Sequence, residues 1–197
     1  MLQLVVTTLK QLISVQKQLI NYAEQKKTIL IERKVDELNK LVQEETKFVT
    51  QLYKLENERE KLVANLLQKH PSLSFSQFVE QIPEASTRNS LQLQVKTLQQ
   101  LMGELQAKNK INERLLKDSM SFVQHMIEQV TKSKQQHFNY QSPMGQQKSS
   151  TNSQGFFDTK AYSKVERRVI HGFNISRIRA WKTRFNGWTS KHRYNRP

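Results

Sequence analysis

Apolar residues recur along this chain at alternating spacings of three and four, the pattern of a helix face that packs in a coiled coil. The first such stretch predicts a helix over residues 2–34. Its apolar seam consists of Leu2, Val5, Leu9, Leu12, Leu19, Ala23 and Leu30. Gln16 and Lys26 occupy two seam positions as polar interruptions.

A second stretch predicts a helix over residues 37–68, with Asp36 as a residue that can cap its start. The chain either breaks or only kinks at this point. The seam consists of Leu38, Leu41, Phe48, Leu52, Leu55, Leu62 and Leu66, with Glu45 and Arg59 as exceptions. We expect the charged residues between them to form a solvated face: Glu44, Glu56, Glu58, Glu60, Lys47, Lys54 and Lys61.

Pro71 ends the second helix, because proline disfavours helical geometry in the residue before it. Ser74 and Gln77 have the spacing of a capping box, which predicts a short helix over 75–81 that ends near Pro83. A third long helix follows over residues 85–133, about 70 Å long at 1.5 Å per residue. Its seam consists of Leu91, Val95, Leu98, Met102, Leu105, Leu116, Val123, Met126 and Val130.

Asn109 and Asn112 fall on seam positions of this third helix. Buried asparagine sets the register of many coiled coils. Alternatively, the two amides face a partner and donate hydrogen bonds to its helix. The sequence leaves both interpretations open.

The composition supports an all-α fold: an elongated antiparallel helical bundle or coiled coil of three main helices with a disordered C-terminal tail. Only 5 Gly and 4 Pro interrupt 197 residues, and there is no cysteine, which excludes disulfides and thiolate metal sites. The start of the chain lacks the features of a signal peptide, and no apolar run has the length of a membrane span. We therefore expect a cytoplasmic protein that does not insert into membranes.

From about residue 134 the sequence becomes rich in Gln, Ser and Asn, with too little apolar surface to offset the entropy of ordering. Four aromatic residues in this tail are either docking residues or unconstrained linker positions: Phe138, Tyr140, Phe156 and Phe157.

The net charge of +15 at first suggests nucleic-acid binding. However, residues 162–197 hold ten Lys or Arg and a single acid, so this segment supplies most of the excess. A nucleic-acid-binding protein is thus favoured only by this segment, where Trp181, Trp188 and Tyr194 lie among basic residues.

Catalytic motifs are absent from the sequence. It contains no Gly-rich phosphate loop, and its five histidines, including His70 and His125, lack the spacing of metal ligands. We expect neither an enzyme nor a cofactor. Long apolar seams are instead typical of proteins that bind a partner helix.

Several segments resemble the FlgN family of flagellar export chaperones. The first two helices with the hinge VDELNKL are followed by SLSFSQFVEQIP, and the third helix carries LQAKNKINERLLKDSMSFVQHMI, similar to the leucine- and asparagine-rich stretch of that family. GFFDTKA resembles the end of members from Gram-positive bacteria, so the likeness spans about residues 1–161. The resemblance implies a chaperone that binds the helical C-terminal region of hook-associated proteins one and three and delivers it to the export gate.

We expect three parts in the chain: a helical chaperone domain over 1–133, a flexible tail over 134–161 that ends in the family-like segment, and a basic extension over 162–197. The extension is either a genuine segment or read-through toward a neighbouring gene. The second interpretation arises because codons compatible with the residues from His171 onward, read in a shifted frame, can encode a start like that of hook-associated protein one. As read-through, it would not have been selected to pack.

The expected partner-binding surface is the third helix, at Leu105, Asn109, Asn112, Leu115, Leu116, Val123, Met126 and Val130. An alternative function is a structural coiled-coil adaptor, whose seams would be covered by self-association.

Overall fold

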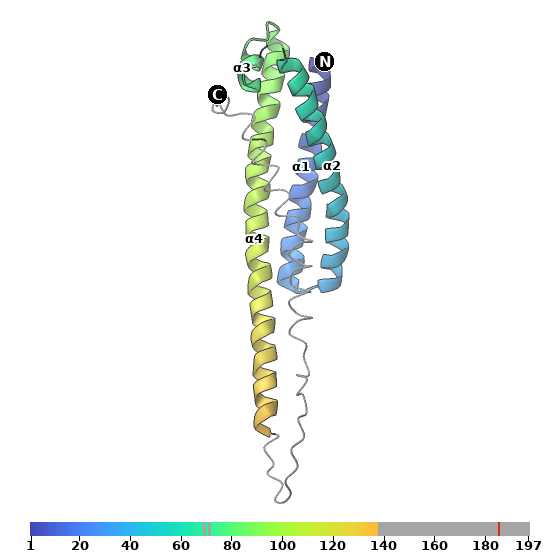
Figure 1. The fold of residues 1–197 in the computed structure, drawn as a ribbon. Helices are drawn as coiled ribbons and strands as arrows, with labels where there is room; N and C mark the ends of the chain where they lie inside the picture. Colours follow the sequence, from blue (N-terminus) through green and yellow to red (C-terminus); the bar gives the residue numbers. More distant parts are fainter. Residues whose placement is uncertain (69, 71, 138–184, 186–197) are drawn as a thin grey trace, which may run out of the picture.

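The fold of the described residues is a bundle of long helices (Figure 1). A computed structural model describes residues 1–68, 70, 72–137 and 185, with side chains in the last helix as far as residue 130. The helices are α1 (Leu2–Glu32), α2 (Val35–Leu67), α3 (Phe75–Glu80) and α4 (Ala85–His137). The prediction of an elongated all-helical bundle is confirmed. The last helix extends four residues beyond the predicted end at 133, and the predicted disordered tail beyond it lies outside the described residues.

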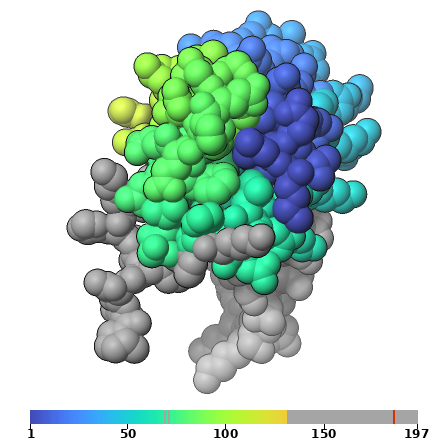
Figure 2. Space-filling model, turned by 90° about the horizontal axis from the view of Figure 1, so that it is seen from above, coloured from blue at the N-terminus to red at the C-terminus, as the bar shows by residue number. Residues whose placement is uncertain are grey.

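The helices α1 and α2 form an antiparallel hairpin, and α4 runs parallel to α1 along its other side (Figure 1). Within the described part of the chain, α1 packs along both long helices, whereas α2 and α4 scarcely contact each other. The short α3 packs on both α2 and α4. Seen along the bundle axis, α3 and the first turns of α4 lie beside the N-terminus of α1 (Figure 2).

The hairpin between α1 and α2 is a true break, made by two residues. Arg33 has the left-handed conformation, φ 59°, that ends many helices. The next helix then begins at Val35, two residues before the predicted start. Asp36 is therefore not the cap but a first-turn residue, where its carboxylate interacts favourably with the helix dipole.

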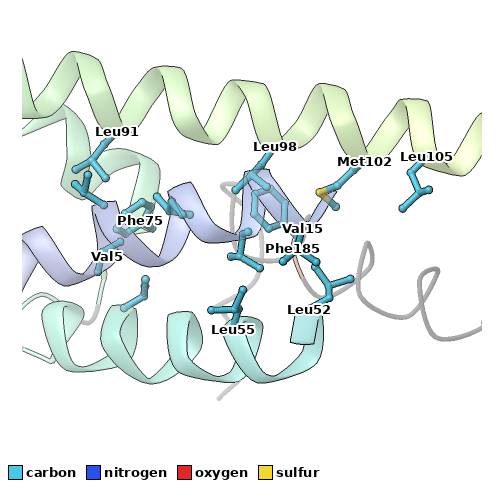
Figure 3. Packing of buried hydrophobic residues seen from close by; sticks show 14 of the residues in the cluster. Val5, Val15, Leu52, Leu55, Phe75, Leu91, Leu98, Met102, Leu105 and Phe185 are labelled. Carbon is cyan, nitrogen blue, oxygen red and sulfur yellow. The ribbon is translucent and has the colours of Figure 1, made fainter. Parts of the chain in front are cut away.

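The capping box at α3 is confirmed. The Gln77 backbone N–H donates to Ser74 Oγ at 3.3 Å, and the Ser74 backbone N–H donates to Gln77 Oε1 at 2.9 Å. The two bonds satisfy amides that the first turn of a helix would otherwise leave unpaired. They hold Phe75 and Val79 of α3 in the core cluster, where Figure 3 shows Phe75 near Val5 and Leu91.

The predicted seam of α1 is buried at every position after Leu2, which is half-buried. The seam predicted for α2 is partly wrong. Phe48, Leu62 and Leu66 are only half-buried, whereas Val49 and Val63 are fully buried. The core-facing side of α2 is wider than one heptad seam, because α2 contacts both α1 and α3.

One polar exception from each of the first two seams takes part in a buried ion pair. Lys26 Nζ lies 2.7 Å from Glu45 Oε2, and neither side chain is exposed to solvent. The ammonium also donates to the other carboxylate oxygen at 2.8 Å. An unpaired charge is costly in a core, so this pair favours the one register of α1 against α2 in which the two residues face each other.

Glu56 contradicts the expected solvated face of α2. Its carboxylate accepts bonds from Arg59, one turn later, and both side chains are buried. An i, i+3 charge pair is ordinarily a surface feature. Here both members of the pair are buried; the heptad pattern placed Arg59 on the seam but assigned Glu56 to the solvated face.

We predict that Lys26→Met lowers the free energy of unfolding by about 3–5 kcal/mol, because the buried Glu45 carboxylate loses its ion pair with the Lys26 ammonium. The double variant K26M/E45L recovers most of this loss, since it removes both charges. Urea unfolding of the four proteins of this double-mutant cycle measures the effect. As a control, Lys117→Met breaks the pair of the exposed Lys117 with the half-buried Glu113 and changes stability by less than about 1 kcal/mol. A K26M/E45L protein no more stable than K26M would contradict the assignment.

Gln16 is fully buried in α1, and neither its amide nitrogen nor its amide oxygen has a hydrogen-bond partner among the described residues. A buried amide without partners loses its hydration without compensation. This position is therefore a weak point of the α1 seam.

We predict that Gln16→Leu raises the free energy of unfolding by about 1–3 kcal/mol, because it removes the uncompensated desolvation of the amide. The same change at the exposed Gln18 serves as the matched control and has an effect within about 0.5 kcal/mol. Thermal unfolding followed by circular dichroism compares the two. A destabilised Q16L protein would show that the amide has a partner that the structure does not record.

Candidate functional site

The seam of α4 continues past the residues that cover it. Positions 91, 95, 98, 102, 105, 109, 112, 116, 119, 123, 126 and 130 keep the alternating spacing of three and four without a break. They therefore lie on one face of the helix. As far as Leu116 this face packs in the bundle, but Val123 is 46% exposed, Met126 48% and Val130 42%. The same face is thus an interior surface in one half of α4 and an exterior surface at its end.

The covered part ends where the α1–α2 hairpin ends. Leu30, Leu38 and Leu116 form a small buried cluster from three helices. Just past it, the Arg33 guanidinium lies 5.3 Å from the centre of the Phe122 ring, a cation–π contact. This contact joins the turn of the hairpin to α4.

We call residues 122–137 the α4 overhang. At 1.5 Å per residue it extends about 24 Å, and Figure 1 shows it continuing past the hairpin. Four of its large apolar side chains are exposed, and a fifth, Ile127, is half-buried. The exposed four are Phe122, Val123, Met126 and Val130. Contiguous exposed apolar side chains of this kind are typical of interaction surfaces.

The structure divides the eight predicted binding residues into two groups. Leu105, Asn109, Asn112 and Leu116 are buried in the bundle, and Leu115 is half-buried beside Leu116. The other three, Val123, Met126 and Val130, lie on the overhang. The four candidate docking aromatics, Phe138, Tyr140, Phe156 and Phe157, lie outside the described residues.

The two seam asparagines contribute differently to the bundle. Asn112 Nδ2 donates to the Ala23 carbonyl oxygen at 2.7 Å, so this amide ties α4 to α1. Asn109 is 3% exposed, and neither of its amide atoms has a partner among the described residues. In this structure Asn112 has the register-setting role.

A surface ion pair reinforces the same register. Lys108 Nζ lies 2.6 Å from Glu24 Oε2, which joins α4 to α1 one turn before Asn112. The hydrogen bond from Lys108 lowers the pKa of the Glu24 carboxyl below its ordinary value, and the same bond raises the pKa of Lys108. Because the folded pKa of Glu24 is lowered, its contribution is present near neutral pH and is lost as the pH falls through that folded pKa. Solvent screening keeps it small.

Sequence reasoning missed Phe122 and Ile127 as members of the exposed face. Both adjoin seam positions, at 123 and 126, and a stripe wider than a strict heptad seam would have included them. The wider stripe is visible in the spacing of 119, 122, 123, 126, 127 and 130.

The described residues contain no group of three His, Cys, Asp or Glu side chains placed to hold a metal ion. Of the helices in this part of the chain, none combines the length and the apolar character needed to cross a membrane.

Comparison with known proteins gave one match. Residues 1–148 match the model of the family described as FlgN protein. Searches of curated proteins and of solved structures found no match. The GFFDTKA segment that also resembles this family lies beyond the matched residues, so that part of the likeness stays a prediction. Because the match covers three quarters of the chain, this protein belongs to the FlgN family, the family of flagellar export chaperones.

Proposed function

We propose that this chaperone binds the helical C-terminal region of hook-associated proteins one and three through the α4 overhang, and delivers them to the flagellar export gate in the cytoplasm. The overhang supplies the contact residues Phe122, Val123, Met126 and Val130. The buried residues of the predicted surface, from Leu105 to Leu116, position the overhang rather than touch the client. The binding role of Phe138, Tyr140, Phe156 and Phe157 remains a prediction.

The observation that carries this proposal is the unbroken seam. A heptad face is shaped to accept side chains from a second helix between its own. Along residues 91–116 of α4 that second helix is α1, and from Phe122 to Val130 the face continues with apolar side chains that are 42% to 52% exposed. A client helix that continues the line of α1 would find the same spacing, with apolar side chains already presented.

The same feature also fits a second candidate function, a coiled-coil adaptor. Two copies of the chain could pair their overhangs and cover each other's seams. The two functions differ in what occupies the face, and the oligomeric state of the free protein separates them. The chaperone proposal expects a monomer whose overhang is covered only when the client is added.

We predict that the double variant V123E/M126E lowers affinity for hook-associated protein one by at least about 100-fold, equivalent to about 2.7 kcal/mol. Binding would bury two charges without partners in an apolar contact. Its thermal stability stays close to that of the parent, because both side chains are exposed in the free protein. Isothermal titration calorimetry measures the affinity, and circular dichroism checks the fold.

The matched control is S121E/H125E, which adds the same number of carboxylates at exposed positions on the opposite side of α4. We expect it to bind like the parent. In contrast to both double variants, Leu116→Glu lowers the stability of the bundle, because it buries a charge beside Leu30 and Leu38. If V123E/M126E binds as tightly as S121E/H125E, the client surface lies elsewhere.

A further inference from the structure

The side of the core between α2 and α4 is filled by residues from outside the three long helices. Because α2 and α4 scarcely contact each other, α1 alone does not cover this side. At the end near the N-terminus of α1, Phe75 and Val79 of α3 fill the space. Further along, the filling residue is Phe185, which is completely buried and belongs to the same core cluster.

Phe185 comes from the basic extension. If this extension were read-through, its residues would not have been selected to pack in a core. Figure 3 shows it between α2 and α4, near Val15 and Leu98. Its ring centre lies 5.6 Å from the guanidinium carbon of Arg59. The matched family region ends at residue 148, so the bundle residues around this ring belong to that region and the ring does not.

The buried ion pair on α2 suits an aromatic neighbour. The Arg59 guanidinium donates two hydrogen bonds to the Glu56 carboxylate, which hold Arg59 in place, and both side chains are buried. A guanidinium is planar and weakly hydrated, and it stacks well on an aromatic face. An aliphatic side chain could cover the pair but would not interact with the charge. We call Arg59, Glu56 and the apolar residues near this ring, Val15, Leu52 and Leu98, the Arg59 site.

We propose that the Arg59 site is a docking site for a single aromatic side chain, and that Phe185 of this chain occupies it as a removable plug. The site is built by α1, α2 and α4, and the tail supplies the ring. Docking of Phe185 fills the flank of the bundle between α2 and α4, away from the overhang. A single ring from outside the matched family region thereby covers this part of the core.

The chain carries its own reporter of this docking. Its only tryptophans, Trp181 and Trp188, lie within four residues of Phe185. In the full chain, Phe185→Ala should lower the steady-state anisotropy of tryptophan fluorescence and the melting temperature, because the segment is released and the site is uncovered. For Phe185→Leu, the anisotropy and the melting temperature should lie between those of the parent chain and those of F185A, since leucine keeps apolar cover but lacks the ring. Phe173→Ala, a change of the same kind in the same tail, should leave both quantities unchanged.

A peptide added in trans tests the site itself. A fluorescein-labelled peptide of residues 177–193 should bind the full-length F185A chain at least about tenfold more tightly than the parent chain, whose site is already occupied. The same peptide with Phe185→Ala should bind both chains equally weakly, which controls for its basic charge. Circular dichroism confirms that the F185A chain remains helical; if it does not, F185L takes its place in the same titration.

Equal binding of the Phe and Ala peptides would overturn the proposal, as would equal binding of the Phe peptide to the two chains. Tryptophan anisotropy in F185A that matches F173A would also contradict it. No client protein enters these measurements. They therefore succeed or fail independently of the proposed function of the overhang.

Discussion

Burial of the seam between α1 and α4 is the interaction on which the rest of this structure depends. The two helices run parallel, and apolar side chains at alternating spacings of three and four bring them together over the whole length of α1. The hydrophobic effect rewards that contact in proportion to the area removed from water. However, α1 has 31 residues and α4 has 53. The seam of α4 therefore extends beyond the end of α1, and the α4 overhang follows from this difference in length.

Polar residues determine the register in which the helices pack along the seam. An apolar heptad face alone permits shifts by whole heptads, because the pattern repeats. The buried pair of Lys26 and Glu45 favours one alignment of α1 with α2, and the bond from Asn112 to the Ala23 carbonyl favours one alignment of α1 with α4. These alignments place the end of the hairpin beside Phe122. The polar interruptions of the seams thus decide how much of α4 is left exposed.

The sequence predicted the helices well because their period is a local property. All three long helices, the short α3 and its capping box could be identified from spacing and from two residue types. Pairings between helices could not. Lys26 and Glu45 were each visible as a polar exception, but only the packed hairpin shows that they face each other. Glu56 was misassigned because a charge next to the seam looks the same whether its flank meets solvent or a core.

A candidate surface on the third helix could be proposed from the sequence, but the exposure of its residues could not be predicted. The third helix was identified as the binding surface, yet no local pattern separates Leu116 from Val123, since both occupy the same seam. Their difference depends on where the hairpin ends, which the turn at Arg33 and the helix register decide together. Phe185 lies beyond the reach of such reasoning for another reason. It is a single core residue in a segment without helical or strand periodicity.

Hydrogen exchange of the α4 backbone, with and without hook-associated protein one, tests the central claim most directly. In the free protein, amides of residues 91–116 should exchange slowly because the helix is covered, and those of 122–130 should exchange faster. Client binding should slow exchange across 122–130 and leave 91–116 unchanged. Protection that appears only outside the overhang, or none at all on a client that binds, would contradict an account in which the client continues the seam of α1.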